Sequence, residues 1–204
     1  MARRTKFEAE MTRNAILDAA ERVFYKHGVA CTSMEQIARA AHVTRGAIYW
    51  HFKDKIEVCD AMTARVFLPQ EDMLKRLGES SSGRPLEELQ AACIQALKLI
   101  ATDKSRRRVV SILTFKCEYI DEMEEIMKRR HACKDEWLKL STRAFARAQK
   151  MQLLAKGWTP KQAATNLQAL MTGMIVNGLE GRKAFDLVKA APACLAAFFR
   201  SVRA

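Results

Sequence analysis

The chain has 204 residues, 49% of them hydrophobic and 28% charged, and a formal net charge of +12. This length exceeds that of a single small motif and allows a second buried core. Residues 1–55 hold 10 basic and 6 acidic residues and the remainder 25 and 17, so the charge favours a polyanionic partner without locating the contact.

No apolar stretch is long enough to span a membrane, and Met1–Lys6 leads into a polar segment, not an apolar signal core. We expect a cytoplasmic protein that has no membrane partner. Six cysteines are scattered without a C-x-x-C pair, so neither a zinc site nor a disulfide framework is predicted. We interpret most of them as small apolar fillers, the alternative being that one senses redox state.

A first helix is predicted from about Thr12 to Lys26. Its apolar stripe repeats at i, i+4, i+7 and i+8, and Gly28 stands at the position that commonly ends a helix. The stripe consists of Ile16, Ala20, Val23 and Phe24.

A second, short helix is predicted next, and two capping pairs fit its start. Thr32 with Glu35 forms a T-x-x-E pattern, and Ser33 with Gln36 is an equally good pair. The apolar residues that follow share one helical face: Met34, Ile37, Ala38 and Ala41.

The twelve residues Thr44–Lys55 are predicted to form one short helix, with Thr44 as its N-cap. Only three residues separate it from the preceding helix, which is the spacing of a helix-turn-helix. Tyr49 and Trp50 cannot both point into one core, so at least one faces outward beside the cationic side chains. Such groups contact phosphates and base edges. Asp54, with Glu57 three residues on, is predicted to cap a fourth helix whose amides suit a DNA phosphate.

Over roughly the first 60 residues the chain resembles the DNA-binding domain of the TetR family of bacterial repressors. The matching segments are Thr32-Ser33, Ile37-Ala38, Val43–Gly46, Ile48–Phe52 and Lys53–Lys55. Weaker matches at Phe115–Tyr119, Thr172–Met174 and Phe185–Leu187 resemble the AcrR and TtgR branch, which controls multidrug efflux pumps. One departure is His42, where relatives often have glycine; a positive φ is easier for His than for most residues.

The resemblance implies an all-α fold of nine helices: residues 1–55 as the helix-turn-helix domain and 56–204 as a ligand-binding and dimerisation domain. It also implies a homodimer that binds a palindromic double-stranded operator. Roles in DNA binding are expected for Thr32, Ser33, Thr44, Arg45, Gly46, Tyr49, Trp50, His51 and Lys55.

After Lys55 the pattern is helical almost throughout, without a convincing alternating strand. Gly78–Gly83 is a loop-like run, and Pro192 lies either in the first turn of the last helix or at a kink. The predicted helices run from Pro85 to about Ala101, Ser105 to near Cys117, Asp121 to about Lys150, Pro160 to about Leu179, and Val188 to Val202.

Several of these helices combine apolar residues with a few hydroxyl and amide groups on one face. Ordinary packing is the alternative, but with the family resemblance we interpret this mixture as a pocket for a small hydrophobic or amphipathic inducer. The predicted ligand-binding residues are Val66, Leu89, Cys93, Ala96, Val110, Thr114, Trp137, Gln168, Met171, Thr172 and Ile175.

The last two helices carry more apolar residues than one stripe requires. In TetR-like proteins these helices pair with their symmetry mates, so we expect the homodimer interface here; the alternative is that they only cover their own domain. The surplus consists of Ala163, Leu167, Leu170, Met174, Leu195, Ala196, Phe198, Phe199 and Val202.

Two other classes of function fit the sequence less well. An enzyme needs converging catalytic groups, but the four histidines lie on separate elements without a metal-binding spacing, so no catalytic residue, metal or cofactor is predicted. A basic membrane-surface protein explains the charge but not the aromatic helix. We therefore expect a ligand-responsive repressor of an efflux operon, with a TetR-like regulator of a metabolic or stress operon as the alternative.

Overall fold

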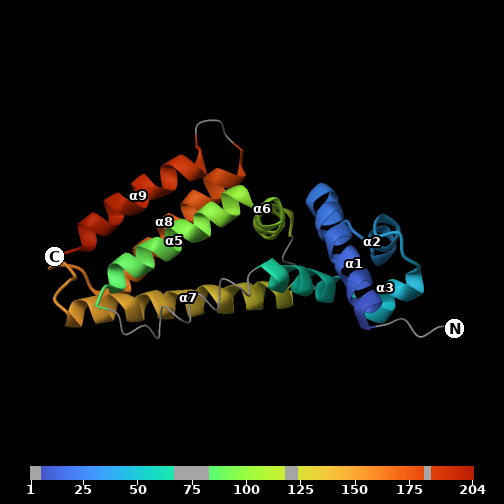
Figure 1. Ribbon diagram of the computed structural model, residues 1–204, viewed down its shortest axis with the longest axis horizontal. Coiled ribbons are helices and arrows are strands. Elements are labelled where there is room, and N and C mark those ends of the chain that lie inside the picture. Colours follow the sequence, from blue (N-terminus) through green and yellow to red (C-terminus); the bar gives the residue numbers. More distant parts are fainter. Residues whose placement is uncertain (1–5, 67–82, 118–123, 182–184) are drawn as a thin grey trace. The chain divides into compact units, whose positions relative to one another are not determined.

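The computed structural model describes residues 6–66, 83–117, 124–181 and 185–204 (Figure 1). These residues form nine helical segments and no strand, only an isolated bridge between Leu154 and Arg203, which confirms the all-α class. The chain divides into two compact units. The first unit comprises Met1–Phe67 and Arg108–Arg129, and the second comprises Leu68–Arg107 and Arg130–Ala204.

The first unit begins with α1 (Lys6–His27), followed by α2 (Met34–Ala40), α3 (Arg45–His51) and a helix over residues 55–66. α1 starts six residues before the predicted Thr12, because its first turns are polar and show no apolar repeat. Its predicted end is confirmed: Gly28 has φ 83°, and its N–H donates to the Phe24 carbonyl at 2.8 Å.

The start of α2 settles the choice between the two capping pairs. The Gln36 amide donates to Ser33 Oγ at 3.2 Å, and the Ser33 amide donates to Gln36 Oε1 at 2.8 Å. Ser33 and Gln36 therefore form the capping box. After α2, His42 adopts φ 55°, which confirms the expected left-handed turn.

Part of α6 (Lys104–Ser111) completes the core of the first unit. The helix continues as a π-helical turn over Ile112–Lys116, so the predicted helix from Ser105 to Cys117 exists but changes its winding. The Lys116 carbonyl accepts from the Val29 amide at 2.9 Å, which ties this turn to the segment after α1. The shared core includes Ile16, Leu17, Phe24, Ile37, Ile48, Phe52, Val58, Met62, Val109 and Ile112.

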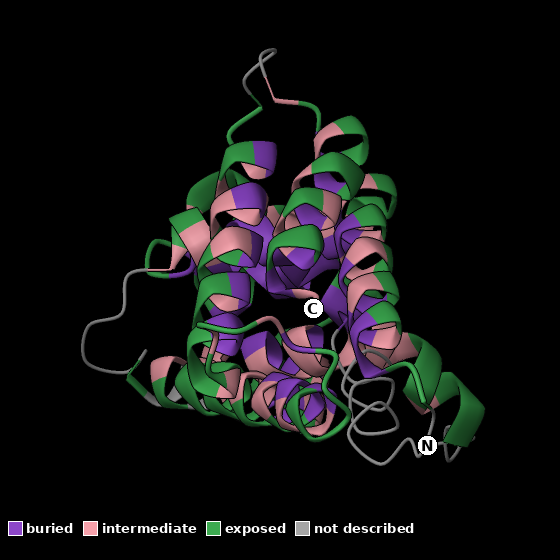
Figure 2. Cartoon of the chain, turned by 90° about the vertical axis from the view of Figure 1, so that its left-hand side faces the viewer, coloured by how far each residue is buried: buried purple, intermediate pink, exposed green. Residues whose placement is uncertain are grey.

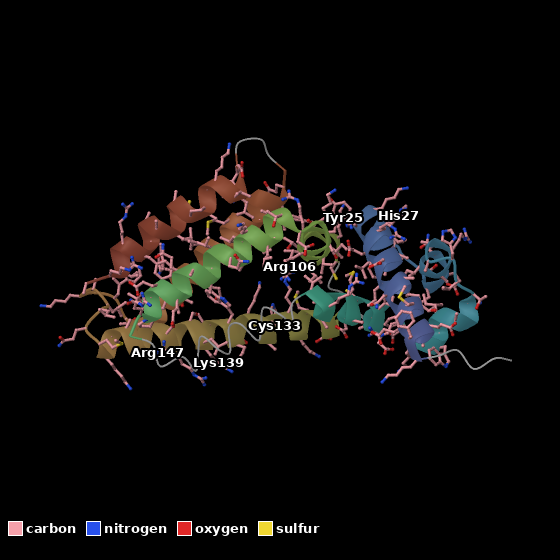
Figure 3. The ribbon with its side chains drawn as sticks, in the orientation of Figure 1. Tyr25, His27, Arg106, Cys133, Lys139 and Arg147 are labelled. Atoms are coloured by element: carbon pink, nitrogen blue, oxygen red, sulfur yellow. The ribbon has the colours of Figure 1, made fainter. Side chains whose placement is uncertain are left out.

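The second unit contains α5 (Pro85–Thr102), most of α7 (Glu124–Lys150), α8 (Pro160–Leu179) and α9 (Leu187–Val202). α5 packs along α9 and α8, and α8 packs against α9 (Figure 1). Arg147 of α7 lies 3.8 Å from Glu88 of α5 (Figure 3). Buried residues of these helices face inward and exposed ones face outward (Figure 2). The fully buried residues include Leu97, Phe145, Leu167, Leu195 and Phe199.

The ends of α8 and α9 follow from local sequence. Thr159 and Gln162 form a capping box around Pro160, the first residue of α8, and Asp186 accepts from the amides of Val188 and Lys189 before α9. α9 begins at Leu187, so Pro192 lies beyond its first turn, inside the helix. The predicted loop at residues 78–82 and the predicted cap at Asp121 lie outside the described residues.

The prediction of the dimer-interface residues is wrong for most of them. Six of the nine are buried within the chain and belong to the core of the second unit. The apolar surplus of α8 and α9 therefore fills contacts with their own neighbours, as the alternative interpretation stated. The six are Ala163, Leu167, Met174, Leu195, Phe199 and Val202.

Candidate functional site

α2 and α3 form a helix-turn-helix in which α3 presents its polar side to solvent. Thr44 caps α3, since its Oγ1 accepts from the Ala47 amide at 3.1 Å. Ile48 and Phe52 are fully buried and hold α3 against the core of the first unit. These two anchors fix which side of the short helix faces outward.

The predicted single helix over Thr44–Lys55 is wrong in its extent. α3 ends at His51, because Phe52 adopts an extended conformation with φ −144° and ψ 126°. A new helix follows, and its Glu57 amide donates to Asp54 Oδ1 at 2.9 Å, which confirms the predicted cap at Asp54. Lys55 therefore belongs to the first turn of the helix over residues 55–66.

Both large aromatic residues of α3 face outward. Trp50 is 72% exposed and Tyr49 43% exposed. The Trp50 and His51 rings meet edge to face with centroids 4.5 Å apart. Among the described residues of the first unit, none covers most of the Trp50 side chain, which leaves it accessible to a partner molecule.

The guanidinium group of Arg45 contacts one residue of α2 and one residue of α3. Its Nε lies 3.4 Å from Glu35 Oε1 on α2, and its Cζ lies 5.7 Å from the centroid of the Tyr49 ring. The side chain is still 74% exposed. Glu35 was not among the predicted site residues, because the sequence pattern indicated it as the capping partner of Thr32.

Gly46 leaves open space on the outer side of α3. A Cβ placed there would meet only Thr44 Oγ1, at 4.0 Å. The fold itself therefore does not require glycine at this position. A glycine here suits the close approach of another molecule to the backbone.

The loop before α2 contributes one buried and one exposed hydroxyl. Thr32 is 3% exposed, and its hydroxyl donates to the Gly28 carbonyl at 2.6 Å, so it shapes the loop instead of reaching the surface. Ser33 is exposed. Lys55 Nζ donates to the Ala30 carbonyl at 3.4 Å, which places the ammonium group beside the same loop.

An ionic cluster around one buried acid in the first unit was not predicted. Glu21 of α1 is 2% exposed, and its carboxylate lies 2.5 Å from Arg108 Nε and 3.5 Å from Arg65 Nη2. Arg65 also lies 2.7 Å from Asp18. Arg108 is 87 positions away from Glu21 in the chain, so no local pattern could have paired these two residues.

The predicted ligand-binding residues are divided between the two units. Val66, Val110 and Thr114 belong to the first unit, where the two valines are buried and Thr114 is half-buried. The others belong to the second unit, on α5, α7 and α8: Leu89, Cys93, Ala96, Trp137, Gln168, Met171, Thr172 and Ile175.

Within the second unit these residues differ in exposure. Leu89, Cys93 and Met171 are buried, and burial raises the pKa of the Cys93 thiol to about 12. Trp137 is half-buried. Gln168 Nε2 donates to the Lys134 carbonyl at 3.1 Å, which links α8 to α7. Ala96 and Ile175 are half-buried, and Thr172 is exposed.

The second unit also has a surface depression of about 280 Å³. On one side Arg107 Nη2 donates to the Gly178 carbonyl at 2.9 Å. None of the predicted ligand-binding residues lines this depression, whose lining is Ala101, Arg107, Gly178, Gly181, Phe185, Asp186, Leu187 and Val188.

Two structural features are absent from the part of the chain that the structure describes. No helix among them combines the length and apolar character needed to cross a membrane. The same residues contain no cluster of three or more His, Cys, Asp or Glu side chains that could hold a metal ion.

Two protein families match the chain in succession. Residues 16–62 match the bacterial regulatory proteins of the tetR family, and residues 84–203 match the C-terminal region of MAATS-type transcriptional repressors. The first match includes α2, α3 and the turn between them.

Individual relatives match over nearly the whole chain. The transcriptional regulator TtgR of Pseudomonas putida is 39% identical over 176 residues, covering 86% of this chain and 83% of TtgR. NalD, the secondary repressor of the MexAB-OprM multidrug efflux pump in Pseudomonas aeruginosa, is 38% identical, with a TM-score of 0.87 and coverage of 97% and 98%.

A third relative was solved with a small molecule. The complex of SmeT with triclosan is 31% identical, with a TM-score of 0.86 and coverage of 95% of this chain and 92% of SmeT. SmeT is the repressor of the Stenotrophomonas maltophilia multidrug efflux pump SmeDEF. The matching families and relatives are transcriptional regulators, not enzymes. The chain belongs to the TetR family of bacterial transcriptional repressors.

Proposed function

We propose that the protein is a ligand-responsive repressor of a multidrug efflux operon. It binds a palindromic operator as a homodimer and leaves it when a hydrophobic small molecule binds. The observation that carries this proposal is the exposed side of α3, where Arg45, Tyr49 and Trp50 face solvent on a helix-turn-helix. The named efflux repressors NalD and SmeT share its fold. In this proposal residues 1–55 read DNA, and residues 56–204 bind the ligand and dimerise.

The DNA contacts divide into base reading and backbone binding. Arg45 reads a guanine through O6 and N7, because its guanidinium offers two parallel donors. Tyr49, Trp50, His51 and Lys55 bind the phosphate backbone, as do Ser33 and Thr44 at the starts of α2 and α3. Gly46 lets the backbone of α3 approach the groove. Thr32 acts indirectly, since its hydroxyl holds the loop at Gly28.

The dimer forms through α8 and α9, but not through the six predicted residues that are buried in the second unit. Four small or β-branched residues of α8 recur at i, i+4, i+7 and i+11 and lie on one exposed or half-buried side. They are Thr165, Ala169, Thr172 and Val176. Small side chains allow close helix packing between symmetry mates, and the two α3 helices then contact half-sites about 34–36 Å apart or a multiple of this distance.

The ligand is amphipathic and largely hydrophobic. The triclosan complex of SmeT supports this class of molecule, and the predicted set around Cys93, Trp137 and Met171 supplies apolar walls. Leu89, Ala96, Gln168 and Ile175, all in the second unit, complete the proposed set, whereas the exposed Thr172 is assigned to the dimer side of α8. Because the Gln168 amide already binds the Lys134 carbonyl, a ligand that uses Gln168 must take over that bond.

Ligand binding acts on DNA binding through α6. The chain passes from the second unit to the first between Arg107 and Arg108, and each arginine is bound within its own unit. Arg107 binds the Gly178 carbonyl, and Arg108 binds Glu21. A ligand that shifts α6 therefore also acts on α1, and on the helix over residues 55–66 through Arg65.

The test starts from an operator selected by the protein itself. The purified full-length protein is used to select duplexes from a random library, and the winning duplex is examined by footprinting and titrated with triclosan. We expect a two-fold symmetric site, one dimer or more per duplex, and release as triclosan rises. Selection of sites without symmetry, or equal affinity for all duplexes, would contradict the proposal. Derepression of a neighbouring efflux operon in a deletion strain would separate efflux control from control of a metabolic or stress operon.

A further inference from the structure

We propose that Glu35 is a positioning residue that sets the specificity of DNA recognition by orienting Arg45. Glu35 also repels DNA phosphates regardless of sequence, so that the protein binds tightly only where Arg45 meets its base. This inference rests on the proposed role of Arg45 as the residue that reads a base.

Glu35 contacts Arg45 through Nε and not through a terminal nitrogen of the guanidinium. Its Oε1 lies 3.4 Å from Nε of Arg45, and the Tyr49 ring lies 5.7 Å from the Arg45 Cζ. Neither contact takes a terminal Nη donor, and a guanine is recognised by two parallel donors of the guanidinium. Glu35 and Tyr49 thus hold the side chain and leave its reading edge to the base.

The Glu35–Arg45 pair orients the Arg45 side chain more than it stabilises the fold. The two side chains are 74% and 45% exposed, and exposed ion pairs contribute little to stability. Arg side chains have many rotamers, so a free Arg45 would lose more conformational entropy on binding a base. A second contact that limits these rotamers before DNA arrives lowers that cost.

The negative charge of Glu35 affects the binding of every DNA sequence. Glu35 lies on α2, next to the α3 surface that is proposed to meet phosphates, and a carboxylate there lowers affinity for every DNA sequence. Glu35 can still raise the ratio of operator to random affinity, because operator DNA offers the oriented Arg45 a base and random DNA does not. The effect on DNA affinity of removing the Glu35 charge can therefore be separated from the effect of releasing Arg45 from its orientation.

Two substitutions separate the effects. Glu35→Gln removes the charge, so we expect affinity for a random-sequence duplex to rise about two- to five-fold while the ratio of operator to random affinity falls at least three-fold. Glu35→Asp keeps the charge but shortens the reach to Arg45. We expect it to leave random-sequence affinity unchanged and still lower the ratio. Glu10→Gln, an exposed carboxylate on α1, serves as the matched control and should leave the ratio unchanged.

The experiment measures both affinities at fixed salt for these variants, for Arg45→Ala and for the double variant Arg45→Ala with Glu35→Gln. The probes are the duplex selected by the wild-type protein and a random-sequence duplex of equal length. In the Arg45→Ala background, Glu35→Gln should raise both affinities by the same factor. A wild-type ratio in Glu35→Gln or in Glu35→Asp would overturn the inference. If Arg45→Ala itself keeps the wild-type ratio, the proposed reading of a base by Arg45 fails instead.

Discussion

The carboxylate of Glu21 on α1 lies 2.5 Å from Nε of Arg108 on α6, and this contact joins two elements that are 87 positions apart in the chain. Glu21 is almost completely buried, whereas the Arg108 side chain is 39% exposed. Arg65, from the helix over residues 55–66, lies against the same carboxylate. One buried acid therefore connects three elements of the first unit.

The first prediction concerns this acid. Glu21→Gln leaves two guanidinium groups without their shared carboxylate, so we expect the free energy of unfolding to fall by about 1–3 kcal/mol, less than for a fully buried pair because both arginines reach solvent. Urea denaturation of the full-length protein measures the change. Glu10→Gln on the exposed side of α1 should stay within about 0.5 kcal/mol of wild type. Equal stability of both variants would show that Glu21 is not a structural centre.

The second prediction concerns transmission through α6. Arg107→Ala removes the bond to the Gly178 carbonyl, so α6 loses a side-chain hydrogen bond to α8 in the second unit. We expect the factor by which saturating triclosan weakens operator binding to fall several-fold, while operator affinity without triclosan changes little. Lys104→Ala, an exposed substitution at the start of α6, is the control. An unchanged factor in Arg107→Ala would exclude this route.

Local sequence predicted most of the helix boundaries and the outward side of α3. Gly28, His42, Thr44 and Thr159 each act within four residues, so their effects were visible in the chain. The extent of α3 was mispredicted because Phe52 is a good apolar residue on the helical face yet takes an extended conformation. Tertiary packing of its buried ring decides this, not its position in the pattern.

The rest of the candidate site depends on distant partners. Glu21 shares a helical face with the buried Leu17 and Phe24, a spacing that indicates a buried acid but not its partner. Likewise, apolar residues of α8 and α9 look the same from sequence whether they meet a second chain or their own core. Leu167 and Phe199 prove to be fully buried in the second unit, while the exposed side of α8 consists of smaller residues such as Ala169.

The third prediction separates phosphate contacts from base reading. Lys55→Ala should weaken binding to operator and random duplexes alike and reduce the slope of log affinity against log salt by about one unit. Lys98→Ala on α5, also a loss of one positive charge, should leave the slope unchanged. If the slope of Lys55→Ala equals that of wild type, the Lys55 ammonium serves only the Ala30 carbonyl.

The fourth prediction concerns the thiols. Burial raises the pKa of both Cys59 and Cys93 to about 12, so at neutral pH almost no thiolate forms at either position. The exposed Cys31 and Cys133 should react quickly with an aromatic disulfide reagent, and the buried pair only on unfolding. Mass spectrometry of the native protein identifies the labelled positions. Rapid labelling of Cys93 in the folded protein would contradict its burial.

The same raised pKa values predict a loss of stability in alkali. A thiol whose folded-state pKa lies above the unfolded value stabilises the fold fully below the unfolded pKa, about 9, and this contribution is lost as pH rises towards 12. Replacing both buried cysteines by alanine should flatten the fall in stability over that range. An equally steep fall in the double variant would assign the alkaline loss to other groups.

The last prediction tests the ligand pocket by fluorescence. Of the three tryptophans, Trp50 is largely exposed on α3, Trp158 packs on Phe198 and donates to the Ser201 carbonyl at 3.0 Å, and Trp137 is half-buried on α7. If the pocket includes Trp137, triclosan should quench the wild-type protein and the Trp50→Phe variant alike. Trp137→Phe should lose most of the quenching.

Two further variants decide whether the quenching reports the proposed pocket. Cys93→Phe adds a ring beside the buried wall of α5 and should weaken triclosan binding about ten-fold or more, because a filled site cannot accept the ligand. Thr172→Leu should change it little if the exposed side of α8 belongs to the dimer. Operator release by triclosan should follow the fluorescence in each variant, since the two equilibria are coupled reciprocally. Quenching that persists in Trp137→Phe and tight binding in Cys93→Phe would place the ligand elsewhere.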